Sequence, residues 1–137
     1  MSVSGSCVCG GVQYRANGDP KVVVNCHCNF CRSHSGAAFS SYIVVPEDAL
    51  EVVAGEGSLS SYEIKEGAHK HFCRQCGTPV YNKNAKYAGL CMIYLGTVKQ
   101  AADCVPTANI YCESQLPWVT HLGEIRSFPQ GIARQAK

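Results

Sequence analysis

The sequence predicts a mostly β fold with at most one or two short helical turns, and two observations support that prediction. Short apolar runs rich in Val, Ile and Tyr recur along the chain, and Gly, Pro, Asn or Ser interrupts them at intervals that suit strands better than helices. Within residues 59–65, Tyr62 and Ile64 alternate with polar residues, as in a strand with one face in water. Because composition marks no linker, the 137 residues are expected to form one domain over 1–137.

Seven segments are expected to be strands: residues 11–16, 40–45, 50–53, 59–65, 79–82, 91–95 and 107–112. Residues 29–35 are the one expected helical turn, since this segment begins at Asn29 and stops before Gly36. Glycine directly follows two of the cysteine groups, at Gly10 and Gly77. A positive φ at these positions would let backbone N–H groups turn back toward sulfur.

Composition and charge argue against nucleic acid as a partner. The charged fraction is 16%, below the roughly 25% of an average globular protein, so the surface is weakly charged or partly covered by a second subunit. We therefore include a homodimer among the expectations. The formal charge of +2 would become −1 if seven cysteines were thiolates on two zinc ions, and the sequence has no basic stripe.

The expected cellular compartment indicates whether the ten cysteines serve as metal ligands or form disulfides. The N-terminus has neither a basic start nor an apolar run of a secretory signal, and no segment approaches the roughly 18 apolar residues of a membrane span. A cytoplasmic location and no membrane partner are therefore expected. In a reducing compartment, cysteines are more often metal ligands than disulfides.

Seven of the cysteines fall into three spaced groups: Cys7-x-Cys9, Cys26-x-Cys28-x-x-Cys31 and Cys73-x-x-Cys76. Structural zinc takes four ligands, usually as two pairs that the fold brings together, and the two outer groups make four. Three ligands remain in the middle group. Catalytic zinc keeps three protein ligands and an open position, so this count indicates a second zinc ion, with a catalytic role, on the middle group.

A closed middle site is the alternative, with a fourth ligand from His27, His34, His69 or His71. In extended backbone His27 would point away from the ion that its neighbours bind. His69 and His71 are the more serious candidates, because they alternate with Cys73 on one strand face. The three remaining cysteines have no ligand spacing and are expected to be small core residues: Cys91, Cys104 and Cys112.

Four motifs in order resemble the glutathione-dependent formaldehyde-activating family, also called the GFA or CENP-V/GFA domain. They read CVCGGVQY (7–14), CHCNFCRSHSG (26–36), FCRQCG (72–77) and ESQLPW (113–118). The resemblance implies a cysteine-pinned fold of several coiled β-sheets. It also implies a structural zinc on Cys7, Cys9, Cys73 and Cys76 and a catalytic zinc on Cys26, Cys28 and Cys31.

The family's type activity joins glutathione to formaldehyde, formally a carbon–sulfur lyase run in reverse. The resemblance thus implies an enzyme whose partners are a small-molecule thiol and a small aldehyde. Two positions depart from the family pattern: His71 stands where an arginine is usual, and Asn109 where a histidine is expected. Both departures bear on the choice of thiol and leave the zinc ligands intact.

Four further residues are candidates for roles around the middle group. His34 could shuttle the proton of a substrate thiol, and backbone N–H groups of Ser35 and Gly36 could meet a substrate carboxylate. Trp118 is expected either as a wall of the substrate pocket or as a large core aromatic. Two other function classes stay open: a non-catalytic zinc module that binds a protein, and a redox sensor that loses zinc on oxidation.

Overall fold

The computed structural model describes residues 2–132 and has the mostly β architecture that the sequence predicts. Its strands are β1 Val3–Ser6, β2 Gln13–Ala16, β3 Val22–Cys26, β4 Ser40–Pro46, β5 Leu50–Ala54, β6 Leu59–Lys65, β7 Ala68–Cys73, β8 Pro79–Asn84, β9 Leu90–Tyr94 and β10 Ala108–Ile110. The α-helix is α1 Asn29–Ser35, and the 3-10 segments are η1 Glu47–Ala49, η2 Glu56–Ser58, η3 Ala85–Tyr87, η4 Leu95–Thr97, η5 Ala101–Asp103, η6 Cys112–Ser114 and η7 Pro117–Glu124. Strands β1, β3 and β7 are additional to the seven that the sequence pattern predicts.

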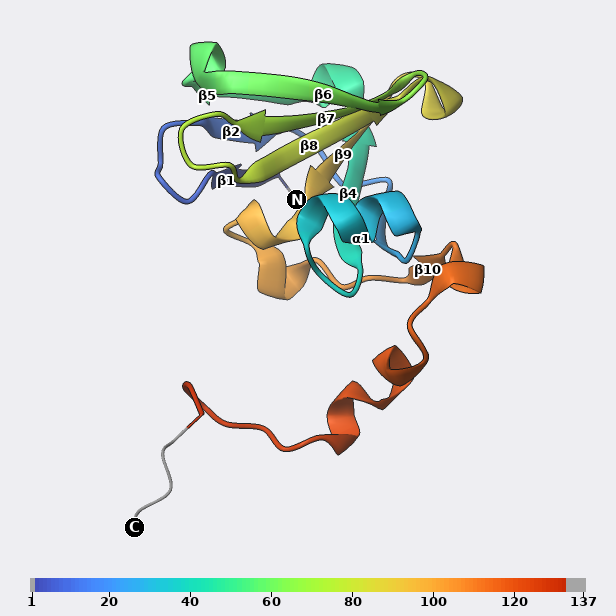
Figure 1. Cartoon of the computed structure of the whole chain (residues 1–137). Coiled ribbons are helices and arrows are strands. Elements are labelled where there is room, and N and C mark those ends of the chain that lie inside the picture. The colour runs from blue at the N-terminus through green and yellow to red at the C-terminus, as the bar shows by residue number, and fades with distance from the viewer. Residues whose placement is uncertain (1, 133–137) are drawn as a thin grey trace.

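The strands form two sheets, which Figure 1 shows curling around a common interior. One has three strands in the order β1-β2-β5, and the other has seven in the order β10-β3-β4-β9-β8-β7-β6. All neighbours in the large sheet are antiparallel except β10, which pairs in parallel with β3. Within residues 2–132, no helix has the length and apolar character needed to cross a membrane.

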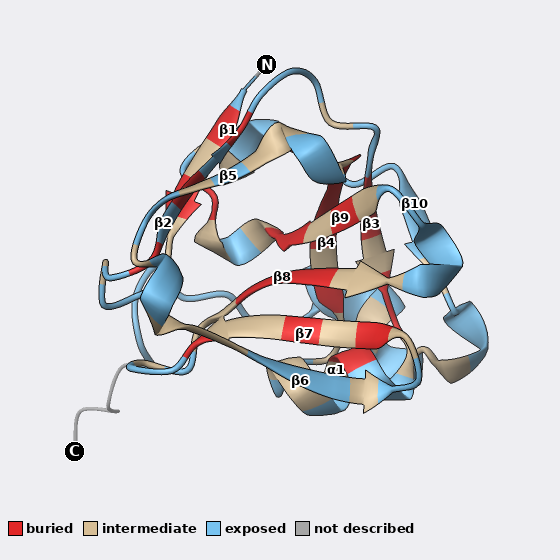
Figure 2. Ribbon diagram, turned by 90° about the horizontal axis from the view of Figure 1, so that it is seen from above, coloured by how far each residue is buried: buried red, intermediate tan, exposed pale blue. Residues whose placement is uncertain are grey.

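Buried side chains divide into two groups, and the second prepares the site described below. The larger core joins both sheets and includes Tyr14, Ile43 and Ile93. The smaller one gathers Cys26 and Cys31 with residues of β3, β4 and β9. Figure 2 shows the buried residues concentrated on strands that face this interior.

The three cysteines without ligand spacing do not share one environment. Cys91 and Cys104 are buried, as predicted. Cys112 is exposed, so the prediction of a core position is wrong there. The cause lies in the preceding residue: β10 ends at Ile110, and Tyr111 takes a left-handed conformation that stops the strand.

After η6 the chain runs away from the sheets as an arm of residues 117–132 (Figure 1). None of these residues is buried, and Trp118 is 52% exposed. The alternative in which Trp118 is a core aromatic is therefore wrong.

Candidate functional site

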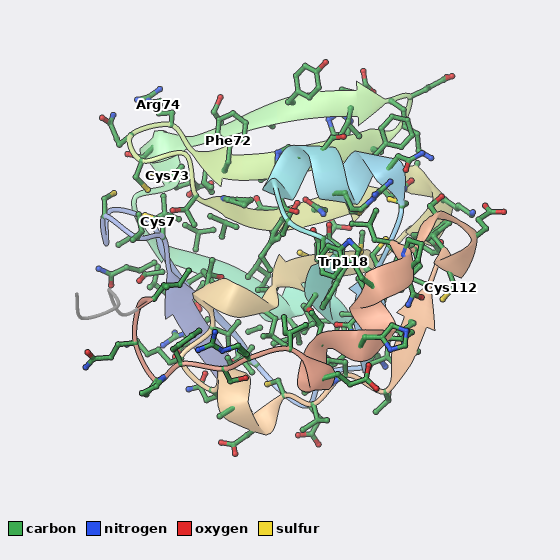
Figure 3. The ribbon with its side chains drawn as sticks, turned by 60° about the horizontal axis from the view of Figure 1, so that its bottom comes forward. Cys7, Phe72, Cys73, Arg74, Cys112 and Trp118 are labelled. Carbon is green, nitrogen blue, oxygen red and sulfur yellow. The ribbon has the colours of Figure 1, made fainter. Side chains whose placement is uncertain are left out.

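The two outer cysteine pairs meet at one end of the molecule. Cys7 and Cys9 follow β1, and Cys73 and Cys76 lie in the turn between β7 and β8, with all four sulfurs within 4.8 Å of one another. The Sγ atoms of Cys7 and Cys9 are 3.5 Å apart and those of Cys9 and Cys73 are 3.9 Å apart. Sulfurs in a tetrahedron around zinc would be about 3.8 Å apart, given a Zn–S bond of about 2.3 Å. This outer cluster could hold a metal ion, and Figure 3 shows Cys7 and Cys73 together.

Hydrogen-bond donors already surround the sulfurs of the outer cluster. The backbone N–H of Val12 donates to Cys7 Sγ at 3.2 Å, and that of Gly11 donates to Cys9 Sγ at 3.4 Å. Hydrogen bonds from Thr78 lower the pKa of Cys76 to about 5. Each donor favours the thiolate of the sulfur that it meets, which is the form that binds metal. At Cys9 the Gly11 N–H lowers the pKa, but the neighbouring cysteine sulfurs raise it to about 11.

The middle cluster forms where β3 passes into α1. Cys26 ends β3, Cys31 lies in α1, and Cys28 is the N-cap of that helix, its sulfur accepting the Cys31 backbone N–H at 3.3 Å. The three sulfurs lie within 4.8 Å of one another and could hold a second metal ion. At the other end of α1, Gly36 adopts a φ of 70° and donates its N–H to the Arg32 carbonyl at 2.8 Å.

No histidine, aspartate or glutamate within residues 2–132 joins the middle cluster as a fourth ligand. The four histidines that the sequence offered each have another neighbour: His27 Nε2 with Asn109 Oδ1 at 3.0 Å, His34 Nδ1 with Tyr94 Oη at 3.2 Å, His69 Nε2 with Glu63 Oε2 at 3.5 Å, and His71 stacked on Tyr81 at 4.4 Å between ring centroids. The expectation that His27 points away from the cluster agrees with this geometry.

Strand alternation explains why His69 and His71 do not reach the middle cluster. Lys70 lies between them on β7, and neighbouring residues of a strand point to opposite faces, so the face that carries Lys70 toward Cys31 turns both histidines away. The residue that β7 turns toward the middle cluster is Lys70, which is only 6% exposed. Its Nζ lies 3.8 Å from Cys31 Sγ.

Lys70 is one end of a row of buried polar side chains that crosses four neighbouring strands. Tyr42 on β4, Tyr94 on β9, Asn82 on β8 and Lys70 on β7 make up this polar row. Tyr42 Oη donates to Cys31 Sγ at 3.1 Å and lies 3.5 Å from Tyr94 Oη. In the amide orientation that satisfies its neighbours, Asn82 Oδ1 accepts from Lys70 Nζ at 2.8 Å and lies 3.0 Å from Tyr42 Oη, for whose single hydroxyl proton it competes with Cys31 Sγ.

The polar row changes the electrostatics of the middle cluster. The hydrogen bond with Cys26, the charge of Lys70 and the Tyr42 hydroxyl lower the pKa of Cys31 to about 5, although burial opposes the shift. Burial and the charge of Lys70 lower the pKa of His34. Among residues 2–132, no carboxylate pairs with Lys70. A buried ammonium needs an anionic partner, and the cysteine sulfurs are the groups beside it.

A cavity of about 470 Å³ opens against the middle cluster and is lined by all three of its cysteines. Its walls are mainly apolar and come from β3, β4, β9 and the end of β10, with Lys70 and Asn82 at the polar row. Tyr87 and Tyr111 belong to the lining on the side of η3 and η6. The volume suits a small molecule, and the cysteines give it a reactive wall.

The four residues that the sequence suggested for roles around the middle group lie outside this cavity, apart from an indirect link for His34, whereas the candidate ligand His69 belongs to its lining. His34 reaches the middle cluster through Tyr94 and Tyr42. Ser35 donates its hydroxyl to the Cys31 carbonyl at 2.7 Å, and neither Ser35 nor Gly36 belongs to the cavity lining. Trp118 is on the exposed arm and is likewise absent from the lining.

Comparison with known proteins gives a consistent set of relatives. The chain matches the family model described as "Glutathione-dependent formaldehyde-activating enzyme" over residues 2–114. A Halomonas elongata protein named "Putative glutathione-dependent formaldehyde-activating enzyme" is 22% identical over 126 residues, which cover 87% of this chain and 80% of that protein. A Phaeosphaeria nodorum protein of the same name is 33% identical over 58 residues, which cover 42% of this chain and 30% of that protein.

Two further matches concern a lyase and a solved structure. A Schizosaccharomyces pombe protein named as an uncharacterized lyase is 25% identical over 77 residues, which cover 56% of this chain and 54% of that protein. A crystal structure of a Rhodobacter sphaeroides protein aligns with a TM-score of 0.65 at 21% identity, over 80% of this chain and 99% of that one. At this identity the structural likeness concerns the fold, and it supports the mostly β architecture.

Proposed function

This chain belongs to the glutathione-dependent formaldehyde-activating enzyme family, and on that premise we propose that it is a zinc-dependent carbon–sulfur lyase that joins a thiol to a small aldehyde or cleaves the adduct. The observation that carries the proposal is the middle cluster: three sulfurs with no fourth ligand, at the wall of a cavity. We further propose that residues 1–137 form one domain and act in the cytoplasm.

The residues present fit two zinc ions per chain, a structural one on the outer cluster and a catalytic one on the middle cluster. Soft thiolate ligands favour zinc, and sulfur separations of 3.5 and 3.9 Å suit a tetrahedral site. Three thiolates with one divalent ion carry a net charge of −1, which Lys70 offsets. The buried lysine therefore supports an ionised, metal-loaded middle cluster over a set of neutral thiols.

A zinc ion on the middle cluster would supply an open coordination position at which a substrate thiol loses its proton near neutral pH. The thiolate sulfur then attacks the aldehyde carbon, so that a C–S bond forms while the C=O π electrons move to oxygen. Lys70 Nζ lines the cavity and can donate a hydrogen bond to that oxygen as its negative charge develops. Protonation of the oxygen completes the hydroxymethyl thioether, and the reverse sequence cleaves it.

Proton transfer has a route through the protein's own side chains. Tyr42 Oη touches Cys31 Sγ and Tyr94 Oη, and Tyr94 Oη lies 3.2 Å from His34 Nδ1. His34 keeps a lowered pKa, so it is neutral near pH 7 and able to accept a proton. In this proposal His34 exchanges the proton of the thiol with solvent.

The test measures metal content and thiol-dependent aldehyde consumption on wild type and on Cys28→Ser. We expect two zinc ions per chain in wild type, about one in Cys28→Ser, and aldehyde consumption that requires both the thiol and Cys28. Cys112→Ser is the matched control, because it removes an exposed thiol outside both clusters.

Each of the other outcomes contradicts one part of the proposal. Two zinc ions with no response to a panel of thiols and aldehydes would contradict the enzyme and leave a binding module. Consumption that survives Cys28→Ser would remove the middle cluster from the reaction. Loss of zinc from wild type on mild oxidation, without any turnover, would favour the redox sensor.

A further inference from the structure

The cavity has a second polar end, distinct from the polar row, at Tyr87 and Tyr111. The two phenolic oxygens lie 3.0 Å apart, and Lys86 Nζ donates to Tyr111 Oη at 3.2 Å. Lys86 Nζ also lies 5.6 Å from the centre of the Tyr87 ring. Lys65 lines the cavity, and its charge acts on Tyr111. Lys86 is exposed and lies outside the lining, which it contacts through the two tyrosines. We call Lys65, Lys86, Tyr87 and Tyr111 the rim cluster.

Tyr111 holds its place in the rim cluster at a conformational cost. It is the only non-glycine residue with a positive φ in the described part of the chain, at φ 56° and ψ 43°. The left-handed region costs a residue with a Cβ about 1–2 kcal/mol. This conformation ends β10 at Ile110 and accompanies the placement of the Tyr111 side chain beside Tyr87 and Lys86. Strain of this kind persists where the surroundings fix it, often at binding sites.

The rim cluster carries positive charge that the protein does not neutralise. Lys83 also lines the cavity, but Glu47 pairs with it at 2.8 Å. Within residues 2–132, Lys65 and Lys86 have no carboxylate partner. Glu113 is the one carboxylate among the described lining residues and offsets Lys65, so the excess of one positive charge comes from Lys86, which lies outside the lining beside Tyr111.

Much of the cavity wall beyond the rim cluster is hydrocarbon. Val24, Val44, Met92 and Ile110 belong to this wall. None of these side chains can hydrogen-bond a peptide amide, and an amide left without a partner in such a place is penalised. Alkyl or aryl groups lose no hydrogen bond there and gain from burial.

We propose that the rim cluster is a carboxylate-binding subsite and that the substrate is a thiol with an apolar body and a terminal carboxylate. The thiol end meets the middle cluster, the body lies along the apolar wall, and the carboxylate takes hydrogen bonds from Tyr87 and Tyr111, with Lys65 and Lys86 supplying positive charge beside them. This inference rests on the proposed function for the reaction at the thiol end. It predicts that hydrocarbon mercapto acids are better substrates than glutathione, whose thiol is flanked by peptide amides.

The test compares 6-mercaptohexanoate with 6-mercaptohexanol as thiols, and it measures binding of hexanoate separately by NMR titration. The variants are Lys86→Met and Tyr111→Phe, with Lys99→Met as control, because Lys99, like Lys86, is an exposed lysine outside the cavity lining but is not the lysine beside Tyr87 and Tyr111. We expect Lys86→Met to weaken hexanoate binding, and to raise KM for the mercapto acid, at least about tenfold. The mercapto alcohol should be affected little, and Lys99→Met should match wild type.

The two readouts separate this inference from the proposed function. Hexanoate binding that depends on Lys86, with no turnover of any thiol, would sustain the subsite and contradict the enzyme. Turnover in which acid and alcohol respond alike to Lys86→Met, or in which Lys86→Met matches Lys99→Met, would overturn the subsite and leave the enzyme standing. A preference for glutathione over 6-mercaptohexanoate in wild type would overturn the apolar-body assignment.

Discussion

The two cysteine clusters should differ in their contribution to stability, and a matched pair of substitutions measures the difference. Cys76 and Cys28 are both half-buried, so replacing either sulfur by a hydroxyl has a similar direct cost. Their structural settings differ. Cys76 belongs to a cluster that joins Cys9 to Cys73 across 64 positions, whereas Cys26 and Cys31 are five positions apart.

Loop-closure entropy gives the size of the effect. The relation used for cross-links assigns about 4 kcal/mol to closing a loop of 64 residues and about 2 kcal/mol to one of five. Serine is also a good N-cap, so Cys28→Ser keeps the first turn of α1 capped. We expect Cys76→Ser to lower the free energy of unfolding by about 4 kcal/mol or more, and Cys28→Ser by less than about 2 kcal/mol. Since domains are stable by only about 5–15 kcal/mol, Cys76→Ser approaches unfolding.

Urea unfolding followed by circular dichroism measures both values, with Cys112→Ser as the control for loss of a thiol outside the clusters. Metal content is measured on the same samples, so that a stability loss can be assigned to loss of an ion. Equal losses in the two variants, or a larger loss in Cys28→Ser, would refute the division into a cross-linking outer cluster and a functional middle cluster.

Three further predictions follow from single features. Lys70→Met should leave the protein folded but less stable by about 3–5 kcal/mol, because removing one partner of a buried charge pair leaves the negative charge of the middle cluster uncompensated, and it should reduce thiol-dependent turnover about 100-fold; unchanged turnover would exclude Lys70 from the reaction. Gly55→Ala should lower the free energy of unfolding by more than about 2 kcal/mol in the same urea assay. A Cβ at this position would lie 1.9 Å from the Gly11 carbonyl oxygen, and Gly55 has a φ of 78°. A loss below about 0.5 kcal/mol, which is the scatter expected of a surface substitution, would contradict the close packing of Gly55 against Gly11. Deleting the chain from Pro117 onward should change the free energy of unfolding by less than about 1 kcal/mol, because no residue of the arm over 117–132 is buried. A larger drop in urea titration would show that the arm makes a stabilising contact, either with the sheets or with a second copy of the chain.

Sequence spacing predicted the two cysteine clusters because a ligand pair is a local pattern. Two residues between Cys73 and Cys76 suit one turn, and the count of seven divides into four and three without knowledge of the fold. The mostly β prediction succeeded for a similar reason, since β-branched runs and turn residues are read locally. The prediction of residues 107–112 as one strand ran too far, because the left-handed Tyr111 has no local signal.

The polar row could not be found in this way. Tyr42, Asn82, Lys70 and Tyr94 come from four strands, and only the register between strands brings them together. A one-residue shift turns a strand's side chains to the other face, so the register that pairs Lys70 with Asn82 decides that Lys70 meets the middle cluster. The one local signal was Lys70 between His69 and His71 in an otherwise strand-like segment. This pattern does not indicate whether the lysine side chain is buried.

The positive charge of Lys70 and the negative charge of a metal-loaded middle cluster compensate each other, which allows both to be buried. This charge balance has a consequence for the substrate. Without an anion, a lysine at 6% exposure would cost several kcal/mol, and without Lys70 a three-thiolate zinc site would leave a buried negative charge. With both present the site is neutral, and an arriving thiolate makes it negative again. A neutral aldehyde adds no charge, and protonation of the alkoxide oxygen then gives a neutral adduct, which removes the excess when it leaves. The proposed reaction therefore returns the site to neutrality at each turnover, whereas a thiolate that stays bound leaves the site negative.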